Sequence, residues 1–303
     1  MYIKYLTRVK YDYIIYIKYL TRVKYILNSK GEDMDTKIVK KKQDLTYLNW
    51  SHIRSSSGTA GTFLKSESSL DGKKIYYKLS NFDSVSGIIG HECVNEIIVD
   101  RLLTILGIEH LHYELINADI EIEGKIYNTY LCASNDFKMR GESKIALDDF
   151  YRTNSEKGET HYDFCVRQGW KSYIDRMIAI DYIILNRDRH GANIEVLRNS
   201  RAHTLRIAPL FDHGLSLVYS CMSDDAVEKF DEMEDKPCQN FIGSYSCYDN
   251  LKLIDDKKKV FKNKLTERDK EIIFEDLEGI LSEVYIDKIW DMIYKRYKIY
   301  ENL

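Results

Sequence analysis

The stretch NRDRHGAN, residues 186–193, decides the fold, and APLFDHG follows it at residues 208–214. Phosphoryl transfer needs a carboxylate beside the acceptor hydroxyl and oxygen ligands for the Mg²⁺ that bridges the phosphates of ATP. An Asp followed after four residues by an Asn, and later by Asp-x-Gly, is the spacing of a kinase catalytic loop and its second metal ligand. We therefore predict that Asp188 is catalytic and that Asn193 and Asp212 bind Mg²⁺ together with ATP.

Either motif alone is equally typical of an ordinary polar turn. The two occur here in the order that a kinase requires, separated by the short β-like segments 194–197 and 205–210. This combination favours a kinase over two unrelated turns. His190, inside the first motif, is expected to hydrogen-bond within the loop beside the nucleotide rather than to transfer a proton.

A lysine in the segment KIYYKL, residues 74–79, supplies a third part of the site. The segment follows an Asp-Gly turn and is predicted to be a strand, from which Lys78 can reach the phosphates of a nucleotide. An exposed strand lysine is commoner, but the helix predicted over residues 92–106 carries a candidate partner for the ion pair that positions such a lysine. Glu92 and Glu96 lie one turn apart on one face of that helix, and we favour Glu96.

A small-residue turn, RSSSGTAGT at residues 54–62, lies between strands predicted over residues 45–52 and 62–66. Its backbone N–H groups are suited to cradle phosphates, although it lacks the full GxGxxG pattern and Ser/Gly turns are common in hairpins. A backbone hinge that binds adenine is expected just after the strand predicted over residues 125–131. The nucleotide-binding residues predicted in these segments are Ser57, Gly58, Thr59, Gly61, Leu131 and Ala133.

The order of the predicted elements is that of a kinase small lobe followed by a helical lobe. Strands and one strong helix occupy residues 34–133, and helices predominate over residues 134–303, the last two over 267–283 and 285–300. We predict an α+β, two-lobed, protein-kinase-like fold with a small β-rich N-lobe and a larger, mostly helical C-lobe.

Composition argues against several classes of protein. The net charge of −3 leaves no electrostatic footprint for nucleic acid, and the basic run Lys37–Lys42 is predicted to lie in a solvated face or loop. Six cysteines without a CxxC pair argue against a zinc ribbon or a disulfide framework and favour the reducing cytoplasm. The apolar residues 13–17 are too few for a membrane span or a secretory signal, and export by a non-classical route stays open.

The order of SSGTAGTFLK, YYKL, HECVNEIIVDRLLTILGI, NRDRHGAN and APLFDHG resembles that of the HipA-like kinases, and more narrowly that of the short cell-translocating kinase A group. The likeness covers residues 49–219. It implies a protein-kinase-like fold, MgATP, and Ser/Thr phosphorylation that includes autophosphorylation of the Ser/Gly loop, for which we choose Ser57. It implies the same roles for Lys78, Asp188, Asn193 and Asp212. Most of the N-terminal extension of full-length HipA has no counterpart in this chain, so an antitoxin-type partner is not implied.

Other functions share parts of this pattern. DRHxxN followed by Asp-x-Gly also resembles the phosphoinositide kinases, although no basic membrane-facing loop stands out. A nucleotide-binding pseudokinase that acts as an interaction module is a second alternative, against which stands the complete set of Lys, Asp, Asn and Asp. Transfer of AMP on a kinase fold is a third. The sequence predicts a protein substrate without identifying it, and does not distinguish a toxin, a secreted effector and a housekeeping enzyme.

Residues 1–33 form an N-terminal extension in which YIKYLTRVKY occurs twice without change, at residues 2–11 and 16–25. Two copies are too few for a solenoid, and they contain no catalytic motif. Met34 is an equally good candidate for the first residue. A chain shortened to begin at Met34 is expected to stay soluble and active, as measured by its soluble yield and its ATP hydrolysis. Loss of either would show that the repeat packs against the small lobe.

Overall fold

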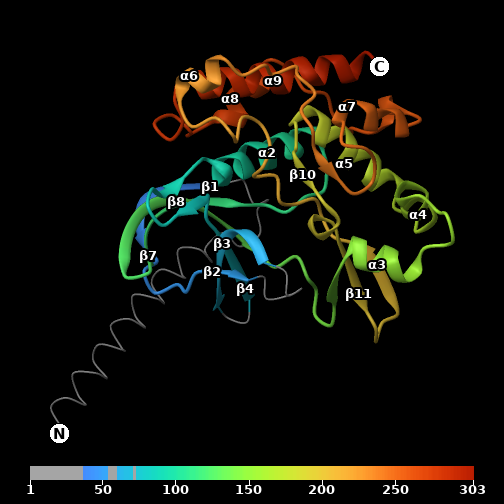
Figure 1. Ribbon diagram of the computed structural model, residues 1–303, viewed down its shortest axis with the longest axis horizontal. Coiled ribbons are helices and arrows are strands. Elements are labelled where there is room, and N and C mark those ends of the chain that lie inside the picture. Colours follow the sequence, from blue (N-terminus) through green and yellow to red (C-terminus); the bar gives the residue numbers. More distant parts are fainter. Residues whose placement is uncertain (1–36, 54–59, 71–72) are drawn as a thin grey trace, which may run out of the picture.

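The computed structural model describes residues 37–53, 60–70 and 73–303. A six-stranded sheet dominates the N-terminal part of the chain, and helices dominate the C-terminal part (Figure 1). One long helix, α2 (Glu92–Leu106), lies between the sheet and the C-terminal helices. The predicted α+β fold, with a β-rich lobe and a helical lobe, is confirmed.

The N-lobe sheet has the strand order β1-β7-β8-β4-β3-β2. β1 runs parallel to β7, and the other neighbouring strands are antiparallel. Side chains alternate along each strand, so one face of the sheet packs into a small apolar core and the other faces α2 and the C-lobe. The strands are β1 (Lys37–Asp44), β2 (Ser51–Ile53), β3 (Ala60–Leu70), β4 (Lys73–Lys78), β7 (Glu114–Ile122) and β8 (Lys125–Asn135), and a hairpin of β5 (Asn81–Asp83) and β6 (Gly87–Ile89) follows β4.

The first described residues test two predictions, one for the basic run Lys37–Lys42 and one for the strand over residues 45–52. The basic run Lys37–Lys42 forms most of the edge strand β1, so it lies on a solvated face, one of the two alternatives predicted. The strand predicted over residues 45–52 is wrong for most of its length. Leu45 and Leu48 are both buried, a three-residue spacing that suits a turn and not the two-residue period of a strand. The pairing of β2 begins only at Ser51.

Helix α2 is buried on almost every face, because it lies between the N-lobe sheet and the C-lobe helices. It ends, as predicted, at Gly107, whose φ of 69° is the left-handed conformation that suits glycine. At the other end, the ring of His91 meets that of Tyr285 edge-on, with the ring centroids 5.0 Å apart. Tyr285 belongs to α9 (Glu283–Glu301), so this contact joins the start of α2 to the last helix of the C-lobe.

The C-lobe is organised around α5 (Lys171–Ile183), across which α9 packs. The helix predicted over residues 267–283 is wrong in its second half. α8 (Asp269–Phe274) is short, because positive φ angles at Asp276 and Gly279 turn the chain away from a helical path. The other elements are β9 (Ser143–Ala146), α3 (Leu147–Asn154), α4 (His161–Arg167), β10 (Asp188–Arg189), η1 (Gly191–Asn193), β11 (Glu195–Asn199), β12 (Thr204–Ile207), α6 (Asp224–Glu228), β13 (Gln239–Asn240), α7 (Cys247–Asn250), η2 (Leu251–Leu253) and η3 (Lys257–Lys259).

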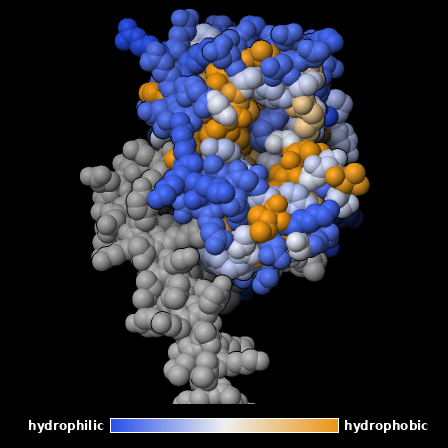
Figure 2. Space-filling model, turned by 90° about the vertical axis from the view of Figure 1, so that its left-hand side faces the viewer, coloured by the Kyte–Doolittle hydropathy of each residue, from blue (hydrophilic) through white to orange (hydrophobic). Residues whose placement is uncertain are grey.

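Hydrophilic residues predominate on the face of the molecule shown in Figure 2, where hydrophobic side chains gather in a few patches. None of the helices in the described part of the chain combines the length and the apolar character that a membrane span requires. The six cysteines are buried as free thiols.

Protonation of His91 is expected to weaken the junction between α2 and α9. Burial lowers the pKa of His91 from its usual value near 6.5 to about 4, because the folded chain disfavours the charged ring. The unfolded chain therefore binds the proton first. The free energy of unfolding should fall as the pH drops from 6.5 to 4, by up to about 3 kcal/mol. His91→Phe keeps a ring that cannot be charged, so this part of the pH dependence of urea unfolding should disappear.

His203→Phe is the matched control, because His203 is exposed in the turn between β11 and β12. This variant should keep the pH dependence of the wild type. If His91→Phe instead loses stability as steeply as the wild type over the same pH range, His91 is not the group that titrates at this junction.

Candidate active site

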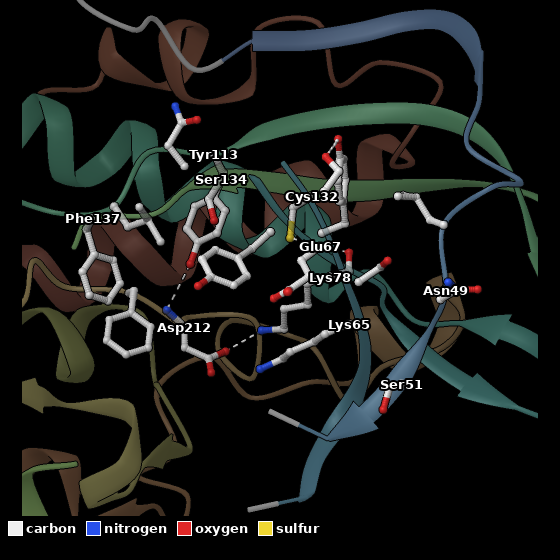
Figure 3. Close-up of a pocket in the computed structure, with 18 of the residues that line it drawn as sticks. Asn49, Ser51, Lys65, Glu67, Lys78, Tyr113, Cys132, Ser134, Phe137 and Asp212 are labelled. Carbon is white, nitrogen blue, oxygen red and sulfur yellow. Dashed lines mark hydrogen bonds and ion pairs between the residues drawn. The ribbon is translucent and has the colours of Figure 1, made fainter. Parts of the chain in front are cut away.

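A cleft of about 640 Å³ lies between the N-lobe sheet and the C-lobe. Strands β3, β4 and β8 contribute Lys65, Lys78 and Ser134 to its lining. Phe137 and Asp212 line the opposite side, and Figure 3 shows these side chains converging on the same space. Because both lobes supply lining residues, the cleft depends on the packing of the two lobes against one another.

Strand β8 presents alternate residues to the cleft. Cys132 and Ser134 line it, whereas Leu131 and Ala133 are buried on the opposite face of the sheet in the small N-lobe core. The segment 131–134, in which the hinge is predicted, therefore reaches the cleft through the side chains of Cys132 and Ser134, and the backbone contact of Leu131 and Ala133 with a nucleotide stays a prediction. The backbone of Ala133 pairs with both β4 and β7, and β8 continues to Asn135, past the boundary predicted at residue 133. Cys132, Ser134 and Asn135 line the cleft.

Lys78, at the end of β4, joins three elements of the fold. Its Nζ lies 2.9 Å from Oε1 of Glu96 in α2, and it forms a second ion pair with Asp212, which Figure 3 marks. Glu92 takes no part in this contact, because its Oε2 accepts a hydrogen bond from the backbone N–H of Asn81 at 3.3 Å. Of the two glutamates that the helical spacing allows, the structure places Glu96 against Lys78.

The fully buried carboxylate of Glu96 also holds the Asp-His-Gly motif. Its Oε2 accepts the backbone N–H of His213 at 2.8 Å, and its Oε1 accepts that of Gly214 at 3.1 Å. The neighbouring Asn95 donates to the carbonyls of Gly214 and Ser216, each at 3.0 Å. Helix α2 therefore fixes the backbone of this motif through two adjacent side chains.

The charges at this centre are set by burial and by pairing. Burial opposes the ammonium of Lys78, but Asp212 and Glu96 outweigh it and hold the pKa of Lys78 well above its usual value. His213 is neutral, because burial, followed by nearby Arg189, lowers its pKa well below its usual value. Lys78 is thus held as a cation between the two carboxylates of Glu96 and Asp212.

Lys65 is a cleft residue that the sequence analysis missed. It lies directly opposite Lys78 in the pairing of β3 with β4, and both side chains reach into the cleft toward Asp212 (Figure 3). Like charges at directly opposed positions on one face of a sheet repel, so an anion bound between them would relieve the repulsion. The signal was present in TFLK, where a lysine ends an otherwise apolar strand segment.

The other end of the cleft is aromatic. Phe137 and Phe211 lie 5.5 Å apart between ring centroids, and the Nζ of Lys144 lies 4.1 Å from the centroid of Phe137. Tyr113 also lines the cleft, and its hydroxyl accepts the backbone N–H of Asp212 at 3.3 Å. Aromatic rings therefore line the cleft next to its charged groups, which suits a ligand that joins a planar base to phosphates.

The predicted catalytic loop is closed by its own hydrogen bonds. The amide nitrogen of Asn193 donates to the carbonyl of Asp188 at 2.9 Å, and the backbone of Asp188 and Arg189 pairs with β13. Asp188 is partly exposed, with its Oδ1 3.7 Å from Nε2 of His190. Asp212 lines the cleft, whereas Asp188 and Asn193 do not.

Arg189, a residue the sequence analysis did not single out, ties the two motifs together. It is almost fully buried and pairs with Asp181 of α5 through Nε and Nη2, each 3.0 Å from a carboxylate oxygen. Its Nη1 donates to the carbonyl of Phe211 at 2.9 Å and to that of Asn193 at 3.4 Å. A lone carboxylate in the apolar segment IAIDYIIL was the signal that such a partner exists.

The remaining predicted residues lie elsewhere. His190 lines a second cavity of about 390 Å³ beside the loop, not the cleft, and its Nδ1 accepts the N–H of Ala192 at 3.2 Å, which is the expected bond within the loop. Gly61 lies in β3. Ser57, Gly58 and Thr59 lie outside the described residues.

No family model and no curated protein matches the chain. Among solved structures, the chain is similar to the proinflammatory kinase CtkA of Helicobacter pylori, with 17% identity, a TM-score of 0.59, and coverage of 86% of this chain and 97% of that one. HipA of Shewanella oneidensis, solved with HipB and operator DNA, is 13% identical over 83% of this chain and 68% of that one, with a TM-score of 0.44. The Golgi casein kinase is 14% identical over 84% and 73%, with a TM-score of 0.41. The likeness to CtkA establishes that the chain has the CtkA type of kinase fold.

Removing the Arg189 guanidinium should destabilise the folded chain strongly. Arg189→Met leaves the carboxylate of Asp181 buried without its cation, which typically costs about 3–5 kcal/mol. The free energy of unfolding in urea measures this loss. Arg152→Met is the matched control, because Arg152 and its partner Asp149 are 73% and 59% exposed and such a pair contributes about 0–1 kcal/mol. Equal losses in the two variants would contradict the assigned role of Arg189.

Proposed function

We propose that the protein is an ATP-dependent protein kinase that phosphorylates Ser or Thr hydroxyls. The observation that carries the proposal is the contact of Lys78 with both Glu96 and Asp212, in a cleft that lies beside the Asp188 loop. A strand lysine paired with a helix glutamate, next to an Asp-x-Gly carboxylate that can bind Mg²⁺, is an arrangement that protein kinases need for catalysis. The CtkA type of fold is consistent with it.

Each residue has a definite place in this reaction. The acceptor hydroxyl oxygen forms a bond to the γ-phosphorus, the bond from that phosphorus to the β–γ bridging oxygen breaks, and ADP leaves. Asp188 orients the hydroxyl and accepts its proton. Lys78 and Lys65 pair with phosphate oxygens, and the aromatic end of the cleft, with Phe137 and Phe211, holds the adenine.

The donor atoms present fit Mg²⁺. Asp212 offers a carboxylate at the cleft, and Asn193 turns its amide nitrogen to the carbonyl of Asp188, so its amide oxygen is the ligand atom that it offers. Hard oxygen donors of this kind are those that Mg²⁺ prefers. Mg²⁺, when bound, neutralises charge on the phosphates.

We place the substrate among proteins and the enzyme in the cytoplasm, where buried free thiols stay reduced. Phosphorylation of the Ser/Gly loop at Ser57 would add about −1.5 to −2 charges beside the triphosphate and weaken its binding. The supports for this switch are the row of hydroxyls in the loop and the resemblance to the HipA-like kinases. A partner of the antitoxin type has no support in this chain.

ATP labelled at the γ-phosphate tests the proposal. The chain incubated with Mg²⁺ and labelled ATP should transfer label to Ser or Thr, including residues between Ser55 and Thr62 that mass spectrometry would locate. Asp188→Ala should lower the rate by roughly 10²–10⁴ and leave nucleotide binding largely intact. Asp225→Ala, an exposed change in α6, is the matched control and should transfer label at the wild-type rate.

Each other result assigns a different function. Label that enters lipid indicates a lipid kinase, label that enters protein only from α-labelled ATP indicates AMP transfer, and nucleotide binding without transfer indicates an interaction module. Full transfer by Asp188→Ala would remove Asp188 from the mechanism.

A further inference from the structure

Three potential metal ligands meet one helical turn beyond Glu96 along α2, outside the residues used above. Asp100 lies in α2, and His110 and His112 lie in the segment that leads from α2 to β7. Oδ1 of Asp100 lies 2.9 Å from Nε2 of His110 and 3.1 Å from Nδ1 of His112. One ligand atom from each of the three residues lies within 4.8 Å of the other two.

The hydrogen bonds of His110 orient its ring so that Nε2 faces the carboxylate of Asp100. Nδ1 lies 2.6 Å from the carbonyl oxygen of Ile108, and a carbonyl only accepts, so Nδ1 carries the proton. A neutral imidazole has one N–H, and its other nitrogen is an acceptor. Nε2 then meets Oδ1 of Asp100 in one of two ways: it carries a second proton and donates it to the carboxylate, or its lone pair and the carboxylate oxygen bind one metal cation together.

We propose that Asp100, His110 and His112 bind a divalent transition-metal ion of the zinc type. Two imidazoles and one carboxylate form a ligand set that zinc accepts, with a fourth position left for water. Tetrahedral bonds of 2.0–2.1 Å place ligand atoms about 3.3 Å apart, a few tenths of an ångström more than the two separations to Asp100. The site is deep on one side and open on the other, since the side chain of His112 is 38% exposed and that of Asp100 is fully buried.

Two of the proposed ligands, His110 and Asp100, are oriented by hydrogen bonds to backbone groups outside the cluster, as ligands in metal sites usually are. The Nδ1–H of His110 donates to the carbonyl of Ile108, which fixes the ring and presents Nε2 to the metal. Oδ2 of Asp100 accepts the backbone N–H of Tyr113 at 2.7 Å, which leaves Oδ1 as the atom that faces both histidines. Both ligating groups are therefore oriented by partners outside the cluster.

The proposed site is joined to the Asp-His-Gly motif through a single short segment. His110 forms a β-bridge with Leu210, and the N–H of Leu111 donates to the carbonyl of Leu210 at 2.8 Å. Tyr113 follows, and its hydroxyl accepts the N–H of Asp212. A metal that fixes His110 and Tyr113 relative to α2 would therefore hold the segment against which Asp212 rests.

Titration of the full chain with Zn²⁺ alone, in buffer that contains excess Mg²⁺ to fill oxygen-donor sites, tests the proposal by calorimetry. We expect one equivalent of Zn²⁺ per chain, and visible absorption bands of tetrahedral geometry when Co²⁺ replaces it. His112→Gln changes the most exposed ligand and so is the least disruptive of the three substitutions. It should weaken Zn²⁺ binding at least tenfold, since loss of an outer partner already costs about 10–100-fold.

His203→Gln is the matched control, because it makes the same change at an exposed histidine in the turn between β11 and β12, away from the cluster. It should bind Zn²⁺ like the wild type, and Zn²⁺ should raise the melting temperature of both by more than that of His112→Gln. The proposal is overturned if the wild type binds no Zn²⁺, or if His112→Gln binds it as tightly as the wild type. In either case His110 is a protonated partner of Asp100 in a purely structural contact. The readouts are binding and stability, so they do not depend on the proposed kinase activity.

Discussion

A buried carboxylate cannot be left unpaired, and the carboxylate of Glu96 is fully buried between the two lobes. It is satisfied by one cation, Lys78, and by two backbone N–H groups, those of His213 and Gly214. These partners come from the N-lobe sheet and from the C-lobe loop, so a single charge connects both lobes to α2. A shift of α2 that breaks one of these contacts exposes the charge to an apolar surrounding, which costs several kcal/mol per ion. The position of α2, the closure of the cleft and the placement of Asp212 therefore depend on one another through the contacts of Glu96.

The same principle recurs beneath the cleft, where the ion involved is positive. The buried charge of Arg189 is neutralised by Asp181. Its Nη1 donates hydrogen bonds to the carbonyls of Phe211 and Asn193. Glu96 therefore holds the Asp-His-Gly motif from the N-lobe side, and Arg189 holds it from the C-lobe side. A loop fixed by two buried charges of opposite sign, one from each side, keeps its geometry while the two lobes stay packed together, which is what a site that positions phosphates requires.

Much of the fold and the outline of the site follow from local sequence. The lobe order, α2 with its end at Gly107, and the contact of Lys78 with Glu96 follow from patterns of period and spacing within single segments. The length of β8 is not predictable in this way: the pattern predicts a strand that ends at residue 131, whereas its pairing with β4 extends the strand to Asn135. Arg189 and Lys65 were missed for another reason: their partners, Asp181 and Lys78, become neighbours only through tertiary packing.

The parallel edge strand β1 has a consequence for how the molecule behaves among its own copies. An open sheet edge is a template for further strands and so for aggregation. Here β1 covers β7, carries the exposed lysines Lys40, Lys41 and Lys42, and has an irregular register between Val39 and Gln43. The opposite edge, β2, is only three residues long. In the described part of the chain, both margins of the sheet are therefore poor templates for further strands, which disfavours edge-to-edge association of the N-lobe.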